Sequence, residues 1–282
     1  MTRTRTRTRT RTGPATWTAA LLLAVPVLAA VLGPLLAPAV TPDDGAPYVL
    51  GDGHPLGTDG TGRDVLGLLL RGGPSALGVA CGAVALAYLL GAPLGLAAAT
   101  TRHRWIDELL MRPVELVLPI PSLLVISVIG VGWRGSALAI ALAVAVINVP
   151  AVARLVRAAA LDAASGPVAE AMLLQGESRT RILFGHIGRT VLPVAAADTG
   201  TRVPLAVFTV AAANFLGLGL DPASPDWGVT IAASREALLI QPWAVCAPAA
   251  LLVMFTVGLN LLADRLLGRG ARERLRRAKA AA

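Results

Sequence analysis

The chain has 282 residues, of which 55% are hydrophobic and only 15% are charged, and its mean hydropathy is +0.68. Soluble domains carry about 25% charged residues, so this composition excludes an ordinary soluble protein and indicates a polytopic membrane protein. The net charge of +8 does not indicate a nucleic-acid partner, because the arginines lie in the tails and in two loops, and no basic face rich in aromatic residues is present.

The chain begins with a basic segment followed by an apolar run. Residues 1–14 alternate Thr and Arg for most of their length and are expected to form a disordered cytoplasmic tail. Residues 15–41 are apolar over a length that suits a first transmembrane helix. A cleaved signal peptide is the competing interpretation, but its apolar region would cover only about 7 to 15 residues.

Residues 42–73 are polar, acidic and rich in turn-forming residues, which places them outside the membrane on the opposite side from the tail. His54, Asp59 and Asp64 could be considered as a metal site. The glycines and the proline between them favour tight turns instead, with Asp64 as a cap for the following helix. The two cysteines lie in separate apolar runs, so neither a disulfide framework nor a metal site is expected.

The next two spans contain glycines and prolines. Residues 74–100 are expected to form the second span, which begins at Pro74 and carries four glycines that permit close helix contact in lipid. The third span, residues 113–131, contains Pro119 and Pro121, which must break its backbone hydrogen bonding. Broken helices at membrane depth are tolerated where they face protein or a water-filled cavity, so the two prolines are candidate pathway residues.

The fourth span is predicted at residues 137–153 and the fifth at 191–213. The fifth contains Asp198 and Arg202, four residues apart on one helix face, and Pro204 at the same level. A charge at a helix centre costs about 2.5 to 3.5 kcal/mol, so the two side chains should face each other or the bundle interior. Two interpretations stay open: a pair that stabilises the bundle, and a pathway or gating contact.

The sixth span is predicted at residues 244–263 and is followed by a basic cytoplasmic tail, residues 264–282. Trp227 and Trp243 suit an interfacial belt. Most of the 25 basic residues then fall on one side, with both termini in the cytoplasm. The predicted fold class is an all-α protein of the cell membrane with six transmembrane helices, of which five lie within a core of residues 74–263.

The polar segment between the fourth and fifth spans, residues 154–190, is too long for a simple connection. It is expected to contain two short helices, residues 168–175 and 178–184, joined by a positive-φ turn at Gly176. Ile182 and Leu183 on the second helix are expected to form a small mixed surface with neighbouring basic side chains. Composition alone leaves open whether the segment is a solvated loop or a docking element.

Glu170-Ala171-Met172, followed after three residues by Gly176, resembles the EAA loop of permease subunits of ATP-binding-cassette importers. Two departures from the family pattern are Met172, in place of a small residue, and Gly188-Arg189, where the family usually has Leu-Pro. Five further segments resemble, in order, those of the dipeptide, oligopeptide and nickel permease family: HPLGTDGTGRDVL (54–66), WIDELLMRPVELVLPIPSLL (105–124), ARLVRA (153–158), NFLGLGLDPASPDWG (214–228) and NLLADRL (260–266).

The resemblance implies a type I importer permease whose cytoplasmic coupling helix contacts an ATPase through Glu170, Ala171, Gly176, Arg179, Arg181 and His186. The implied partners are a second permease subunit, two ATPase subunits that bind ATP and magnesium, and an external substrate-binding protein. The chain itself has no P-loop, and its single lysine is Lys279, so it is expected to bind no cofactor and to be no enzyme. The implied solute is a peptide or a related small solute such as nickel.

The alternative from another class is an ion-coupled secondary transporter that uses Asp198 and Arg202. Such a transporter is expected to contain an inverted second half with matching broken helices, and no repeat of this kind is present in the sequence. A membrane enzyme lacks support, because no nucleophile with a nearby base is present.

Overall fold

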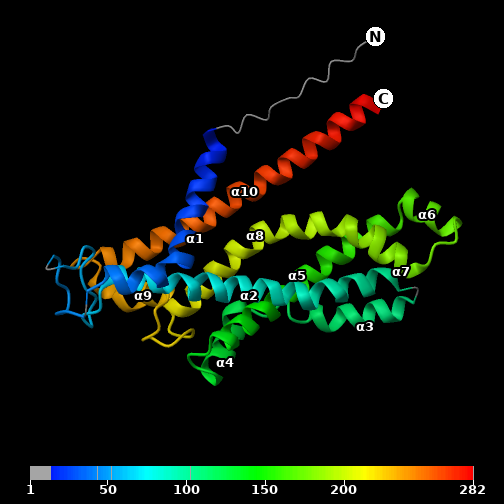
Figure 1. Ribbon diagram of the computed structural model, residues 1–282. Coiled ribbons are helices and arrows are strands. Elements are labelled where there is room, and N and C mark those ends of the chain that lie inside the picture. Colours follow the sequence, from blue (N-terminus) through cyan, green and yellow to red (C-terminus); the bar gives the residue numbers. More distant parts are fainter. Residues whose placement is uncertain (1–13, 43, 52, 102, 282) are drawn as a thin grey trace, which may run out of the picture.

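The computed structural model describes residues 14–281 apart from residues 43, 52 and 102, with side chains between residues 17 and 265. The predicted disordered tail lies outside the described residues except for its last position. Several long helices run side by side, with the long loops at one end and the short helices of residues 167–181 at the other (Figure 1). The elements are α1 (Pro14–Val40), α2 (Val65–Thr100), α3 (Arg104–Glu115), α4 (Ser122–Gly132), α5 (Ala137–Ala164), α6 (Pro167–Leu174), α7 (Arg179–Arg181), the π-helix η1 (Ile182–Ile187), α8 (Gly188–Phe215), α9 (Trp227–Ser234), the 3₁₀ turn η2 (Arg235–Ala237) and α10 (Trp243–Ala281).

Four helices in the described part of the chain are long and apolar enough to cross a membrane, which makes this a multi-pass membrane protein. They lie in α1, α2, α5 and α10 and match the first, second, fourth and sixth predicted spans. The fifth predicted span corresponds to α8, which has 28 residues but carries a charged pair near its middle. The tail predicted after the sixth span continues α10 as helical backbone to Ala281.

The prediction that the second span begins at Pro74 is wrong, because α2 begins at Val65 and continues through Pro74. Asp64 starts the helix as predicted: its Oδ2 accepts a hydrogen bond of 2.7 Å from the backbone N–H of Gly67. Pro74 lacks the N–H that would bond the carbonyl of Leu70. The backbone of Gly33 in α1 packs against this carbonyl so closely that any side chain at position 33 would collide with it.

Two of the four glycines predicted to allow close contact do so. Gly91 and Gly95 lie against the backbone of α5, where a Cβ atom at position 91 would be 3.0 Å from the carbonyl oxygen of Val149. Nothing lies within 4 Å of a Cβ atom added at Gly78 or Gly82. Both glycine pairs have a spacing of four residues, so the sequence could not tell which pair contacts another helix. The position of α5 decides that it is the pair Gly91 and Gly95.

The third predicted span is two helices rather than one. The break falls at Pro119 and Pro121 as expected, between the end of α3 and the start of α4. With 11 residues, α4 is about 16 Å long, which is too short to cross a bilayer. In helix α3, Met111 is buried with Ala98 of α2 and Ala153 of α5, while the exposed side chains include both charged residues and the apolar Trp105 and Leu109.

The end that carries the predicted external segments is held together by contacts between residues 41–73 and the region around α9. Trp227 is fully buried, and its indole N–H donates a hydrogen bond of 2.8 Å to the carbonyl oxygen of Leu69. Gln241 Nε2 donates to the carbonyl oxygen of Leu56 at 3.0 Å. The prediction that Trp227 lies in an interfacial belt is therefore wrong, since the folding back of this segment gives its ring a site inside the protein, whereas Trp243 is exposed.

The three side chains considered as a metal site take part in turn hydrogen bonding. His54 Nδ1 lies 3.0 Å from Asp64 Oδ1, and both residues are buried. Asp59 accepts hydrogen bonds from Thr61 and from Arg63, at 2.7 to 3.0 Å. Burial opposes the charged form of Asp59, but these hydrogen bonds outweigh it and hold the pKa of this carboxyl below its usual range.

Asp226 is the N-cap of α9, and substitutions of it test the hydrogen bonding at this end of the molecule. Its Oδ1 accepts hydrogen bonds from Asn214 Nδ2 at 2.9 Å and from the backbone N–H groups of Gly228 and Val229 at 2.8 and 3.3 Å. Burial raises the pKa of Asp226, so the folded protein binds this proton more tightly than the unfolded chain. Its contribution to stability therefore falls as pH rises from the ordinary carboxyl pKa to the raised value.

We expect Asp226→Asn to keep the acceptor at Oδ1, to remove this pH dependence and to leave thermal stability at neutral pH equal or higher. Asp226→Ala should lower stability by about 1 to 3 kcal/mol, because buried donors lose their acceptor. Melting curves of the purified protein in detergent at several pH values measure both effects. Equal melting temperatures for the alanine variant and the wild type would contradict the assignment.

Candidate functional site

The predicted coupling segment forms a compact unit at one end of the molecule. Helix α6 follows Gly166 with a proline in its first turn and ends at Leu174, as predicted within one residue. Gly176 has φ of +76°, and the backbone N–H groups of Gly176 and Glu177 bond the carbonyls of Leu173 and Met172, both at 3.1 Å. This pair of hydrogen bonds is a Schellman motif, which requires a residue that tolerates positive φ.

The second short helix is not a separate element. Helix α7, the π-helix η1 and α8 follow one another without a break from Arg179 to Phe215. Ser178 caps α7 by accepting a hydrogen bond from the backbone N–H of Arg181. The helical backbone is therefore continuous from the predicted coupling segment into α8. The sequence did not indicate this, since π-helices have no simple sequence pattern.

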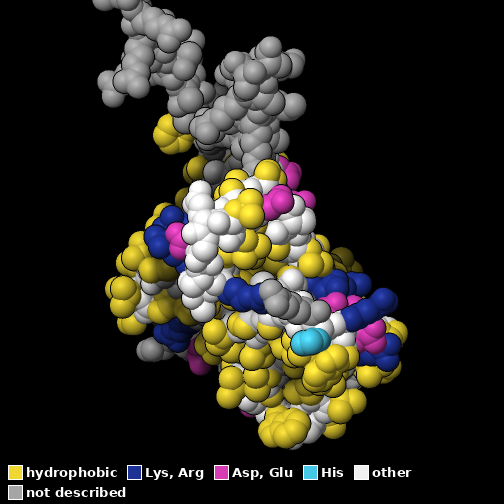
Figure 2. Space-filling model, turned by 90° about the vertical axis from the view of Figure 1, so that its right-hand side faces the viewer, with side chains coloured by type: hydrophobic (Ala, Val, Ile, Leu, Met, Phe, Trp, Pro, Cys, Tyr) yellow, Lys and Arg dark blue, Asp and Glu magenta, His cyan; other side chains and the backbone are white. Residues whose placement is uncertain are grey.

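The structure places the six predicted coupling residues on neighbouring elements. Glu170, Ala171, Gly176, Arg179 and Arg181 are exposed, whereas His186 in η1 is half-buried. Arg181 forms an exposed ion pair of 3.1 Å with Glu177. The end-on view of Figure 2 shows basic and acidic side chains in a band across this end of the molecule, with hydrophobic side chains next to the band.

The prediction that Ile182 and Leu183 form part of a mixed surface is wrong. Ile182 is buried and Leu183 is half-buried, and both belong to an apolar cluster between α2, α5 and the coupling segment. The exposed large apolar side chains of α6 and η1 are instead Val168, Leu173, Leu174 and Phe184, with exposed fractions between 54% and 84%. The π-helical turn changes which residues face inward, so helical spacing from the sequence misassigned them.

Met172, one of the two departures from the family pattern, packs against the same apolar cluster. It is half-buried, beside the fully packed Ala169. The larger side chain therefore adds apolar contact between α6 and this cluster. The second departure, Gly188-Arg189, lies at the junction of η1 and α8, where the N–H of Gly188 bonds the carbonyl of Leu183.

An ion pair joins α3 and α5 near the coupling segment. Arg157 of α5 donates two hydrogen bonds to Asp107 of α3, at 2.8 and 2.5 Å. Such a bidentate pair holds both helices in a defined orientation. Neither residue was singled out from the sequence, because they lie 50 positions apart.

The membrane-embedded pair predicted from the sequence is formed and is part of a larger network. Arg202 Nε and Nη2 donate to the carboxylate of Asp198 at 2.6 and 3.0 Å. Arg202 Nη1 also donates to Asn148 Oδ1 of α5 at 3.3 Å, and the Tyr88 hydroxyl of α2 donates to Asp198 Oδ2 at 2.5 Å. The side chains of Arg202 and Asp198 are 10% and 19% exposed. The pair is thus directed toward neighbouring helices rather than lipid.

The other candidate pathway residues lie apart from this network. Pro119 and Pro121 are exposed in the turn between α3 and α4, whereas Pro204 is buried within α8. In the described part of the chain, no hydrogen bond or ion pair joins the proline turn to Asp198 or Arg202. Tyr88 and Asn148 were missed by the sequence analysis, although a tyrosine and an asparagine inside apolar spans are a weak signal for a buried polar contact.

A family model described as the binding-protein-dependent transport system inner membrane component matches residues 91–272. The chain belongs to this family. A dipeptide transport system permease protein of Alkalihalophilus pseudofirmus is 32% identical over 217 residues, which cover 76% of this chain and 70% of that protein. A di/tripeptide permease protein of Pseudomonas aeruginosa is 30% identical over 75% of this chain and 69% of that protein.

Solved structures show the same fold for this family member. The inward-facing MetNI methionine ABC transporter superimposes with a TM-score of 0.59 at 19% identity, covering 72% of this chain and 95% of that chain. The predicted fold class, an all-α permease of the type I importer kind, is therefore confirmed. The chain is an inner-membrane transport component, and an ion-coupled secondary transporter is not favoured.

Proposed function

We propose that this permease subunit imports peptides, or a related small solute, with energy supplied by separate ATPase subunits. Its similarity to dipeptide, di/tripeptide and glutathione permease proteins supports the peptide class. In this proposal ATP and magnesium bind to the ATPases and not to this chain. An external binding protein delivers the solute, and a second permease subunit completes the pathway.

The observation that carries the proposal is the surface at α6. Leu173 and Leu174 are exposed at 56% and 84% beside the carboxylate of Glu170, and the exposed Arg179 follows the glycine turn. An exposed apolar patch with a charged rim is typical of a protein interface. Its direct connection to α8 gives an ATPase bound there a mechanical path into the membrane. With this end inside, both chain termini are cytoplasmic in the proposal.

We expect an ATPase subunit to be recovered with the tagged permease complex from detergent, and Leu174→Asp to reduce its recovery about tenfold. The reason is that a carboxylate replaces an apolar side chain that a partner would desolvate. Leu239→Asp is the matched control, because Leu239 is 98% exposed in the external segment before α10. Equal losses in both variants would indicate a general defect and contradict the assignment of this surface.

A further inference from the structure

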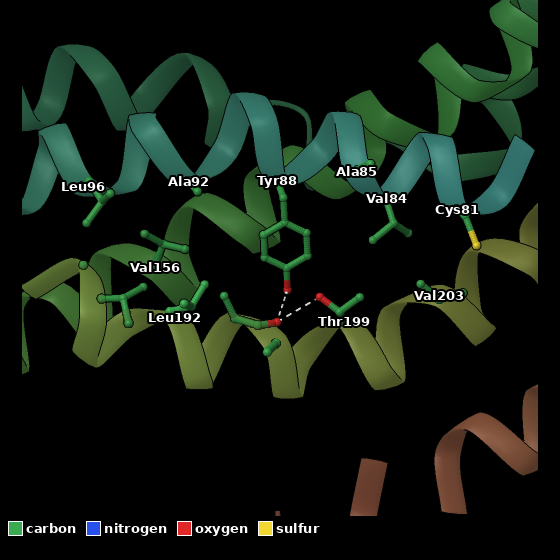
Figure 3. A pocket seen from close by; sticks show the side chains of 14 residues that line it. Cys81, Val84, Ala85, Tyr88, Ala92, Leu96, Val156, Leu192, Thr199 and Val203 are labelled. Carbon is green, nitrogen blue, oxygen red and sulfur yellow. Dashed lines mark hydrogen bonds between the residues drawn. The ribbon is translucent and has the colours of Figure 1, made fainter. Parts of the chain in front are cut away.

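A cavity of about 620 Å³ runs along the boundary between α2 and α8. Figure 3 shows that small and apolar side chains line it and that the ring of Tyr88 extends across it from α2 to α8. Cys81 and Ala85 line the part of the cavity toward the external end of α2. Ala92 and Leu96 line the part toward the opposite end, so Tyr88 divides the cavity into two halves.

Tyr88 contacts α8 through its hydroxyl group. The hydroxyl lies 3.0 Å from the carbonyl oxygen of Ala195 and 2.5 Å from Asp198 Oδ2. Arg202 donates hydrogen bonds to Asp198 and to Asn148 of α5. At the level of Tyr88, α8 is therefore hydrogen-bonded to both α2 and α5. Residues of α2 and α8 line the cavity on both sides of this level, so part of the boundary between the two helices is not filled by side chains.

Close packing normally prevents helices from moving against each other, and a cavity on each side of a fixed contact removes this obstacle at both ends. The inner end of α8 is continuous with η1, α7 and the coupling segment. A force on the coupling segment would therefore tilt α8 toward α2 on one side of Tyr88 and away from α2 on the other side. The polar contacts at Tyr88 are preserved during such a tilt, since they lie at its centre.

We propose that Tyr88 is the pivot about which α8 tilts during the transport cycle, and that the two cavity halves close alternately. The inference rests on the proposed function for the direction of the force and for the assignment of inside and outside. It assigns Tyr88 as a positioning residue whose hydroxyl holds α8 at the Ala195 carbonyl, next to Asp198. Two states related by a tilt about a fixed contact are sufficient to expose a pathway on opposite sides in turn.

The test fills one half of the cavity at a time. Ala92→Phe fills the inner half and Ala85→Phe the outer half, and Leu89→Phe is the control on the same helix, because Leu89 is 68% exposed and does not line the cavity. The full complex with its ATPases and binding protein is reconstituted in lipid. Each filling variant is expected to lower solute transport about tenfold and the control less than about twofold. Ala92→Leu and Ala85→Leu are smaller fillings that should act in the same directions.

Spin labels at Ala97→Cys of α2 and Thr190→Cys of α8, with both native cysteines replaced by alanine, report the distance between the inner halves, because both positions are exposed and lie near the inner ends of their helices. Filling the inner half should shift this distance to longer values and filling the outer half to shorter values, relative to the control. Shifts in the same direction, or no shift with normal transport, would overturn the pivot. Absence of transport by the unmodified complex would instead refute the proposed function, so the two failures are distinguishable.

Discussion

Gly176→Val is expected to uncouple solute transport from ATP hydrolysis while leaving the protein in the membrane at normal amounts. Gly176 has φ of +76°, a conformation that costs a β-branched residue about 1 to 3 kcal/mol. Nothing lies within 4 Å of a Cβ atom added there, so the effect would come from the backbone and not from a clash. Relaxation of the turn would break the Schellman motif and rotate α6 relative to α7.

The measurement compares ATP hydrolysis with solute uptake in the reconstituted complex, and uptake per ATP should fall about tenfold or more. Gly176→Asn is the control, because asparagine tolerates this conformation better than other residues with a side chain. Glu170→Lys reverses a charge on the same surface and should also uncouple transport. If the valine and lysine variants both transport normally, the coupling segment does not transmit the force.

Arg202→Met is expected to cause the largest loss of folded protein among single substitutions in the membrane-spanning helices considered above. It leaves the carboxylate of Asp198 in the bundle with the Tyr88 hydroxyl as its remaining side-chain partner. Breaking a buried ion pair by removal of one partner costs about 3 to 5 kcal/mol, whereas replacing both partners by apolar groups is often neutral. The double variant Asp198→Leu with Arg202→Met should therefore recover most of the folded protein.

This double variant also decides between the two interpretations of the pair. The pair is directed at α2 and α5, and Tyr88 keeps its contact with the Ala195 carbonyl in the double variant, so we expect transport per folded protein to be at least about half of the wild type. Folded protein is measured by size-exclusion chromatography and uptake in proteoliposomes. Normal folding with loss of transport would show that the charges themselves act in the pathway.

Much of the helical organisation could be predicted, since long apolar runs allow few alternatives in lipid. The α6 turn was also predictable, because Gly176 follows a short helix and precedes polar residues. The start of α2 was misplaced because a Gly-Pro pair favours a helix start, yet the Asp64 cap acts earlier in the chain. The third span was misjudged because apolar length does not reveal how two prolines divide it.

Composition and charge distribution established a multi-pass membrane protein with a polar segment outside the lipid, because charges and unpaired backbone groups are costly in hydrocarbon wherever they fall in the fold. The charged pair at Asp198 and Arg202 was equally evident, since it is local to one helix. The tertiary structure alone decided that Tyr88 and Asn148 complete that pair and that a cavity flanks Tyr88. Contacts between distant segments depend on which helix faces pack together, and the many small residues of this chain permit several packings of similar apolar area.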